Sequence, residues 1–325
     1  MQSRSPVSVA PMMDWTDRHC RYFMRLLSPS TGLYTEMVTA AALEYGDAEK
    51  LLRFDASEHP VALQLGGSDP GQMAQAARMG AVAGYDEINI NVGCPSDRVQ
   101  SGAFGACLMS RPGIVADCVR AMRSVVDIPV TIKTRIGIDD LDSYEFLRDF
   151  VGTNADAGCT TFVVHARIAI LAGLSPKENR SIPKLNYDRV YRLKRVFPEL
   201  TIILNGGVTT VDECREHLQQ VDGVMIGRQA YHQPWFLTEL EQVFGDTVDT
   251  SVPERRDVIR RMTPYIEREL ANGVELKHIT RHLLGLYAGQ PGARAWRRYL
   301  SENAHRPGAG IEVLQTALER SPQAA

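Results

Sequence analysis

Eight short apolar runs, separated by segments with helical periodicity, constrain the fold of this 325-residue chain more than any other feature. The runs are rich in β-branched residues and nearly continuous in apolar character, which is typical of strands buried on both faces of a parallel sheet. We expect strands at residues 7–10, 33–37, 61–65, 87–92, 130–134, 161–165, 201–204 and 223–226. We expect helices between them, for example at residues 70–83, 112–126, 143–157, 187–197 and 210–220.

This alternation predicts an α/β fold with a parallel sheet, and eight repeats predict a closed (β/α)8 TIM barrel. The alternative is an open doubly wound sheet, which alternates in the same way. Two features disfavour it: no GxGxxG sequence follows the first strand, and polar residues or glycines come directly after nearly every strand. In a barrel those strand ends line the active-site face.

The strand pattern stops after about residue 240. Helical patterns follow at residues 253–271, 276–287, 293–303 and 311–319, separated by breaks such as Asn272-Gly273 and Pro291-Gly292. These helices predict a small all-helical domain. We therefore divide the chain into a catalytic barrel domain over residues 1–242 and a helical domain over residues 243–325.

Composition excludes several classes of protein. No charge-free stretch approaches the roughly 18 residues that a membrane-spanning helix needs, and the N-terminus lacks the apolar core of a signal peptide. Six cysteines without a CxxC pair argue against a disulfide framework and against a metal site. We expect a soluble, cytoplasmic, monomeric protein with no membrane partner and no metal.

Glycine-containing turns follow the seventh and eighth predicted strands. They read Asn205-Gly206-Gly207 and Gly227-Arg228. In barrels the loops after these two strands often bind phosphate, and glycine lets backbone N–H groups approach phosphate oxygens closely. Either turn alone is compatible with a plain β-turn, but the two together at these strand ends favour a phosphate site.

Polar side chains close three other predicted strands: Gln64, Lys133 and His165. All three would project from one face of the barrel, where an inward lysine is costly unless a charge pairs with it. Singly, Gln64 is compatible with strand-end capping and His165 with a hydrogen-bonded core histidine. Together they favour a cup for a phosphate-bearing cofactor whose isoalloxazine ring they would anchor.

Cys94 differs from the other five cysteines in its setting. It follows the fourth predicted strand, between Gly93 and Pro95, which predicts an exposed turn at the mouth of the barrel. A thiol at this place can deliver a proton to a substrate that faces the cofactor. The remaining cysteines, Cys20, Cys107, Cys118, Cys159 and Cys214, fall in helical or helix-end segments, where packing explains them.

The net charge of −3 hides an uneven distribution. Residues 251–325 carry 12 basic and 8 acidic side chains, whereas the rest of the chain carries 24 and 31. Basic residues dominate residues 277–306, where Glu302 is the single acid and His278, His282, Trp296 and Tyr299 are interleaved. Positive charge with aromatic rings suits phosphate contacts and base stacking, so we favour RNA binding over a solvated helix face.

Several motifs in the same order make the chain resemble the tRNA-dihydrouridine synthases. The longest is ININVGCP at residues 88–95, accompanied by VAPM at 9–12, QLGG at 64–67, KTR at 133–135, HAR at 165–167, NGG at 205–207 and GR at 227–228. The segments SPKENR at 175–180 and GARAWRRYL at 292–300 are similar to the A-type bacterial subgroup.

The resemblance implies a tightly bound FMN, NADPH as electron donor, and reduction of uridine in the tRNA D-loop, at positions 20 and 20a for this subgroup. It implies hydride transfer from reduced FMN to C6 of uracil and protonation of C5 by Cys94. The implied cofactor contacts are Pro11, Met12, Met13, Gln64, Lys133, His165, Asn205, Gly206, Gly207, Gly227 and Arg228. The implied tRNA contacts are Asn91, Arg167, Lys177, Arg180, Arg294 and Arg297.

One loop departs from the family pattern. Ile168-Ala169-Ile170 stands where similar sequences usually carry a basic residue followed by an aromatic one. Because isoleucine can neither pair with phosphate nor donate a hydrogen bond, the departure leaves more of the substrate contact to Arg167.

Two alternatives stay open at the level of sequence. A flavin barrel acting on a free metabolite, similar to dihydroorotate dehydrogenase, would share the phosphate cup but would not need the basic helical segment. An RNA-binding protein without enzymatic activity would explain that segment, but it would not explain Cys94 or the polar strand ends.

Overall fold

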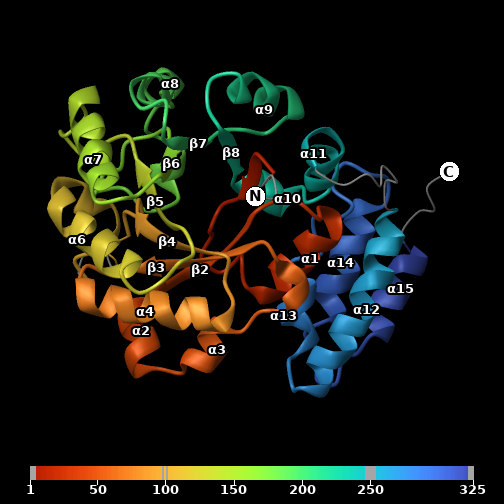
Figure 1. The fold of residues 1–325 in the computed structure, drawn as a ribbon. Helices are drawn as coiled ribbons and strands as arrows, with labels where there is room; N and C mark the ends of the chain where they lie inside the picture. Colours follow the sequence, from red (N-terminus) through yellow and green to blue (C-terminus); the bar gives the residue numbers. More distant parts are fainter. Residues whose placement is uncertain (1–4, 97–98, 100–101, 246–253, 321–325) are drawn as a thin grey trace. The chain divides into compact units, whose positions relative to one another are not determined.

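The computed structural model describes residues 5–96, 99, 102–245 and 254–320. By their contacts these residues divide into two compact units. The barrel unit contains residues 6–13 and 32–227, and the helical unit contains Ser5, residues 14–31 and the described residues from 228 onward. Figure 1 shows the strands and their covering helices in red to green and most of the helical unit in blue.

Eight parallel strands form the barrel unit, which confirms the predicted (β/α)8 fold. They are β1 (Val7–Val9), β2 (Leu33–Thr39), β3 (Val61–Gly66), β4 (Glu87–Val92), β5 (Val130–Arg135), β6 (Thr161–His165), β7 (Thr201–Asn205) and β8 (Gly223–Ile226). Their order is β1-β8-β7-β6-β5-β4-β3-β2. Gly32, just before β2, closes the ring on β1: the Val9 N–H donates to Gly32 O at 2.8 Å, and the Gly32 N–H donates to Val7 O at 3.1 Å.

Helices follow the strands of the barrel unit, and α4, α6, α7, α8 and α9 lie close to their predicted bounds. They are α2 (Ala40–Tyr45), α3 (Ala48–Leu52), α4 (Pro70–Ala83), α6 (Pro112–Arg123), α7 (Tyr144–Asp156), α8 (Tyr187–Val196) and α9 (Val211–Leu218), with short 3₁₀ turns at Ala56–Glu58, Gly105–Ser110 and Glu178–Arg180. Side-chain caps fix where they begin: Asp69 accepts from the Gln72 N–H before α4, and Thr210 forms a capping box with Glu213 before α9.

The two faces of β4 differ in chemistry. Ile88, Ile90 and Val92 are fully buried on one face, and Ile88 lies against α4, where a Cβ on Gly80 would come within 2.7 Å of its Cδ1. Glu87, Asn89 and Asn91 alternate with them on the other face. The sequence analysis predicts that β4 is almost continuously apolar. The structure instead shows a polar face on this strand.

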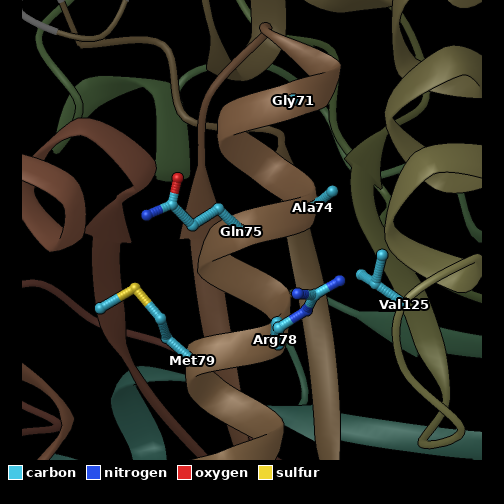
Figure 2. A pocket seen from close by; sticks show the side chains of 6 residues that line it. All are labelled: Gly71, Ala74, Gln75, Arg78, Met79 and Val125. Carbon is cyan, nitrogen blue, oxygen red and sulfur yellow. The ribbon is translucent and has the colours of Figure 1, made fainter.

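A groove of about 490 Å³ lies outside the barrel, on α4. Figure 2 shows Gln75, Arg78 and Met79 of this helix beside it, and Val125 lies beyond the end of α6. None of the predicted site residues lines this groove.

The helical unit is built from α1 (Arg18–Leu27), α10 (Arg228–His232), α11 (Phe236–Phe244), α12 (Arg255–Ala271), α13 (Leu276–Thr280), α14 (Ala293–Asn303) and α15 (Glu312–Arg320). The predicted helix at 276–287 is wrong in length, since α13 ends at Thr280 and turns follow. Within these turns Gly285 approaches the backbone so closely that a Cβ there would lie 2.7 Å from His232 O.

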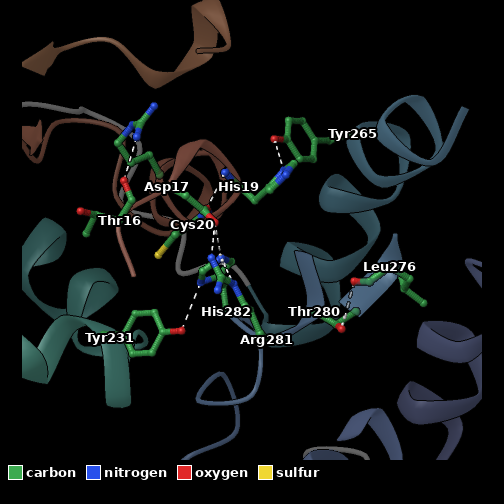
Figure 3. A network of polar contacts seen from close by, with 11 residues as sticks. Thr16, Asp17, His19, Cys20, Tyr231, Tyr265, Leu276, Thr280, Arg281 and His282 are labelled. Carbon is green, nitrogen blue, oxygen red and sulfur yellow. Dashed lines mark hydrogen bonds and ion pairs between the residues drawn. The ribbon is translucent and has the colours of Figure 1, made fainter. Parts of the chain in front are cut away.

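A half-buried carboxylate ties the start of α1 to the turn that follows α13 (Figure 3). Asp17 caps α1 by accepting from the His19 and Cys20 N–H groups, and it also binds Arg281 at 2.5 Å and His282 at 3.0 Å. Burial alone would raise the pKa of Asp17, but the hydrogen bonds and charges of these partners lower it overall. Asp17 is therefore a charged anchor of the helical unit.

The compact units do not follow the predicted domain boundary. Residues 14–31 and 228–242 lie in the helical unit, although the sequence boundary assigns them to the barrel. Whether residues 1–242 and 243–325 are the functional domains stays a prediction. No helix in the described ranges is long and apolar enough to cross a membrane.

Candidate active site

The Cys94 turn is fixed by backbone contacts directly after β4. Asn91 Oδ1 accepts from the N–H groups of Gly93 and Cys94 at 3.1 and 3.0 Å, and the Ala106 N–H donates to Cys94 O at 2.9 Å. Gly105 has a φ of +76°, and a Cβ there would lie 2.6 Å from Cys94 O, so this close approach requires glycine. The Cys94 side chain is half-buried, and its position is set by this turn.

The register of the sheet brings the other strand-end groups to the same edge of the barrel. Asn91 of β4 pairs with Lys133 of β5, and two residues further along β5 Arg135 pairs with His165, which pairs with Asn205. In a parallel barrel this carboxyl-terminal edge is where active sites form.

Lys133 and His165 are both desolvated at this edge. Burial, reinforced by the positive charge of Arg135, lowers the pKa of Lys133 to about 7. Burial, together with the charges of Arg135 and Lys133, lowers the pKa of His165 well below its ordinary value. His165 Nδ1 is buried and has no hydrogen-bond partner within the described ranges. Both side chains can therefore engage a bound group.

Arg135 connects the loop after β4 with two places in the loop after β6. Its Nε donates to Gly93 O at 3.0 Å, and its Nη1 donates to Ile168 O at 3.1 Å and to Asn179 O at 2.9 Å. Burial lowers its pKa to about 10, so the guanidinium stays charged at neutral pH. The sequence pattern alone assigns Arg135 no role of its own. Arg135 lies two residues after Lys133 on β5 and therefore on the same face of the strand. This spacing is the signal that could have revealed a role for Arg135.

The glycines after β7 adopt conformations that other residues avoid. Gly206 and Gly207 have φ values of +112° and +83°, and a Cβ on Gly206 would lie 3.2 Å from His165 Nε2. Asn205 Nδ2 fastens this end of β7 by donating to Met225 O at 2.8 Å. A Cβ on Gly227, after β8, would meet nothing within 4 Å, so open space adjoins that turn.

The remaining predicted cofactor contacts have varied surroundings. Gln64 is 1% exposed and hydrogen-bonded on both sides of its amide, whereas Met12 packs against the apolar interior of the barrel and Met13 is 56% exposed. Pro11 is half-buried. Arg228 is the first residue of α10 and belongs to the helical unit.

The loop after β6 carries basic side chains and is held in place by hydrogen bonds within the loop. Lys177 and Arg180 are exposed, and the buried Asn179 between them exchanges hydrogen bonds with the Ile170 backbone at 2.7 and 2.8 Å. Arg167 donates to Ser181 O and Pro183 O. Arg135 and Asn179 hold this loop through the backbone of Ile168 and Ile170. These contacts do not use the side chains at the two positions, where similar sequences usually carry a basic and an aromatic residue.

The expected base-stacking role of the tail aromatics is wrong for two of them. Trp296 is 0% exposed and donates from Nε1 to Leu283 O at 2.9 Å, and His282 is 2% exposed. Their spacing reflects packing of the helical unit. Arg294 and Arg297 are exposed on α14, whereas the neighbouring Arg298 pairs with Glu302 at 2.7 Å.

The other cysteines are placed as core or helix-end residues. Cys20, Cys118, Cys159 and Cys214 are buried, and burial raises the pKa of the last three to about 12. Cys107 is half-buried, and its thiol lies 3.1 Å from Phe104 O. In the part of the chain that the structure describes, no cluster of three or more His, Cys, Asp or Glu side chains could hold a metal ion.

The carboxyl-terminal edge of the barrel carries a thiol on a fixed turn, two desolvated basic groups and left-handed glycines. This arrangement is that of a (β/α)8-barrel enzyme. Comparison with known proteins identifies the class further. The profile of the dihydrouridine synthase family matches residues 8–321, so the chain belongs to the dihydrouridine synthase family, and its members are oxidoreductases. This membership disfavours the free-metabolite and non-enzymatic alternatives.

Curated relatives match almost the whole chain. A protein of Vibrio cholerae is 61% identical over 318 residues, covering 97% of this chain and 96% of its own length. A protein of Escherichia coli K12 is 61% identical over 314 residues, covering 96% and 90%. One of Salmonella typhimurium is 60% identical, covering 96% and 94%. Each of the three is named tRNA-dihydrouridine(20/20a) synthase.

Proposed function

We propose that this chain is an FMN-dependent, NADPH-using tRNA-dihydrouridine synthase that reduces the C5–C6 double bond of uridines 20 and 20a in the tRNA D-loop. The names of the relatives support the substrate. The observation that carries the chemistry is the fixed Cys94 turn beside Lys133 and His165 at one edge of the barrel.

The groups at this edge fit FMN. Gly206, Gly207 and Gly227 would receive its phosphate, because their backbones are not covered by side chains of their own. Lys133 and His165 would contact its ring, since each is desolvated and His165 Nδ1 lacks a partner within the described residues. Gln64 and Asn205 would border it, and Pro11, Met12 and Met13 would lie along it.

Bound and reduced, FMN would supply the hydride that adds to C6 of uracil. Cys94 then delivers the thiol proton to C5 and is left as a thiolate, so that hydride and proton together saturate the double bond. The Asn91 carboxamide holds the Cys94 turn during this transfer. Lys133 and Arg135 lie close enough to Cys94 to interact with it electrostatically.

Basic side chains, all exposed except the half-buried Arg167, would hold the tRNA while the uridine leaves its stack, which costs about a few kcal/mol. Arg167, Lys177 and Arg180 belong to the barrel unit, and Arg294 and Arg297 belong to the helical unit. Asn91, which accepts from the backbone N–H of Cys94, would contact the uridine itself.

The substrate assignment is tested in a strain that lacks its own dihydrouridine synthases. Expression of this chain should restore dihydrouridine at positions 20 and 20a, mapped by reverse-transcription stops or mass spectrometry of isolated tRNA. Restoration at other positions would overturn the site assignment, and restoration at none would overturn the activity.

A further inference from the structure

A row of hydrogen-bonded polar side chains runs through the barrel unit from the Cys94 turn toward Glu87. At its first end, Asn91 Oδ1 accepts from the N–H groups of Gly93 and Cys94. Asn91 Nδ2 then donates to Gln64 Oε1 at 2.8 Å. The carboxamide that holds the turn is thus itself held by a second carboxamide.

The row continues from Gln64 through the core. Gln64 Nε2 donates to Asn89 Oδ1 at 2.7 Å, Asn89 Nδ2 donates to Thr131 Oγ1 at 2.8 Å, and the Thr131 hydroxyl donates to Glu87 Oε1 at 2.6 Å. Asn89 is 0% exposed and both Gln64 and Thr131 are 1% exposed, so bulk water cannot replace a lost partner. We call Asn91, Gln64, Asn89, Thr131 and Glu87 the polar row.

The direction of every hydrogen bond in the polar row is set from both ends. A backbone N–H can only donate, so the atom of Asn91 that faces Cys94 must be oxygen, and the orientations of Gln64 and Asn89 follow one after the other. At the far end a carboxylate can only accept, so the Thr131 hydroxyl must point to Glu87. Both ends demand the same direction, and a reversed amide would place two donors or two acceptors face to face.

Building on the proposed function, we propose that Glu87 is a positioning residue that acts through Thr131 and Asn89. By fixing the amide orientations of Gln64 and Asn91, it holds the Cys94 turn where the thiol proton can reach C5 of the substrate. Proton transfer depends steeply on geometry, and a misplacement of about 1 Å can cost about a hundredfold in rate.

Tyr34 provides a matched control within the same cluster. Its hydroxyl also donates to Glu87 Oε1, at 2.8 Å, and it is buried like Thr131, but it does not lie between Glu87 and Cys94. Tyr34→Phe and Thr131→Val each delete one buried hydroxyl bound to the same oxygen atom. A merely structural role for these hydroxyls predicts similar effects of the two substitutions.

The experiment compares both variants with wild type and with Thr131→Ser, which keeps the hydroxyl. Each is loaded with FMN, and two rates are measured by flavin absorbance: reduction by NADPH, and reoxidation of the reduced protein by tRNA that lacks dihydrouridine. The alkylation rate of Cys94 by iodoacetamide, followed on its peptide by mass spectrometry, reports the position of the turn without any substrate.

We expect Thr131→Val to slow reoxidation by tRNA about ten- to a hundredfold and to change Cys94 alkylation, with NADPH reduction within about twofold of wild type. Tyr34→Phe and Thr131→Ser should stay close to wild type in all three measurements. Should Thr131→Val fail to fold, Asn89→Leu interrupts the polar row one residue further along at similar volume, and the same result is expected.

Equal effects of Thr131→Val and Tyr34→Phe, or no effect of either on the reaction with tRNA, would overturn the positioning role. The proposed function is judged separately on the wild-type protein. If wild type takes up FMN and its reduced form is reoxidised by tRNA, that function stands whatever the variants do.

Discussion

At the scale of single residues, Cys94 is set apart from the other thiols by its surroundings. Cys118, Cys159 and Cys214 are buried, which raises their pKa values to about 12 and keeps them protonated. Cys94 is half-buried on a turn held by Asn91 and Gly105. This position suits it to donate a proton.

Cys94→Ala should retain FMN and its reduction by NADPH but lose proton delivery. Because a positioned general acid contributes about 10²–10⁴-fold, we expect reoxidation of the reduced flavin by tRNA to slow by that order. Cys107→Ala, which removes the other half-buried thiol, is the control and should behave as wild type. An unchanged single-turnover rate in Cys94→Ala would rule out this acid.

Lys133 should make the stability of the flavin-free protein depend on pH. Its pKa falls from an ordinary value of 10.5 to about 7 on folding, so between these pH values the unfolded chain binds a proton that the folded protein does not. The destabilisation is absent above pH 10.5, grows as the pH falls toward 7 and is complete below that.

Lys133→Met should therefore raise the Tm of the flavin-free protein by a few degrees at pH 7 and by less at pH 10, measured by calorimetry. The same variant should bind FMN more weakly. A Tm gain that does not change with pH would show that the lysine is not desolvated.

At the scale of the elements, the glycine turns after β7 and β8 have different requirements: glycine is needed for the fold in the first, and we expect it to be needed for ligand binding in the second. Gly207 needs its left-handed backbone and lies against Tyr187 and Leu185, so any side chain there disturbs the fold. A Cβ on Gly227 would have no atom within 4 Å, so an added methyl group would enter open space only.

Gly227→Ala should lower FMN affinity about tenfold or more while leaving the Tm of the flavin-free protein unchanged, because the methyl group would occupy the place of the phosphate. Gly113→Ala, which also meets open space but lies at the start of α6, is the matched control. Titration of flavin fluorescence measures both. Unaltered affinity in Gly227→Ala would remove Gly227 from the phosphate contacts.

The strands and most helices of the barrel could be predicted from sequence because long apolar runs and cap residues are local signals. The bounds of α4, β4, β6 and β8 agree with the expectation residue for residue. The polar row could not be predicted, since it joins β3, β4 and β5 through side chains 25 to 44 residues apart. The alternation of Glu87, Asn89 and Asn91 was its only trace in the sequence.

At the scale of the whole molecule, sequence order and compact units differ. Helix α1 lies between β1 and β2 in the chain but belongs to the helical unit, where Asp17 binds Arg281 and His282. Contacts more than 260 residues apart leave no local pattern. For the same reason Trp296 resembled a stacking platform in the sequence, although it is a core residue.

Exposed arginines of the helical unit should contribute to tRNA binding through charge. Arg294→Glu combined with Arg297→Glu should weaken binding about tenfold or more at low salt and reduce the dependence of affinity on salt. Arg298→Glu is the matched control, because the Arg298 charge is already paired with Glu302 on the same helix. Filter binding over a salt series distinguishes them, and equal affinities of all variants would exclude α14 from the tRNA interface.

The proposed reaction is the reduction of a tRNA uridine by reduced flavin and Cys94 together. Its most direct test is an anaerobic single turnover, in which FMN-loaded protein reduced by NADPH is mixed with tRNA that lacks dihydrouridine. We predict that flavin reoxidation and dihydrouridine at positions 20 and 20a appear together, in equal amounts. A reduced flavin that is stable in the presence of this tRNA, or one reoxidised without formation of dihydrouridine, would contradict this proposal.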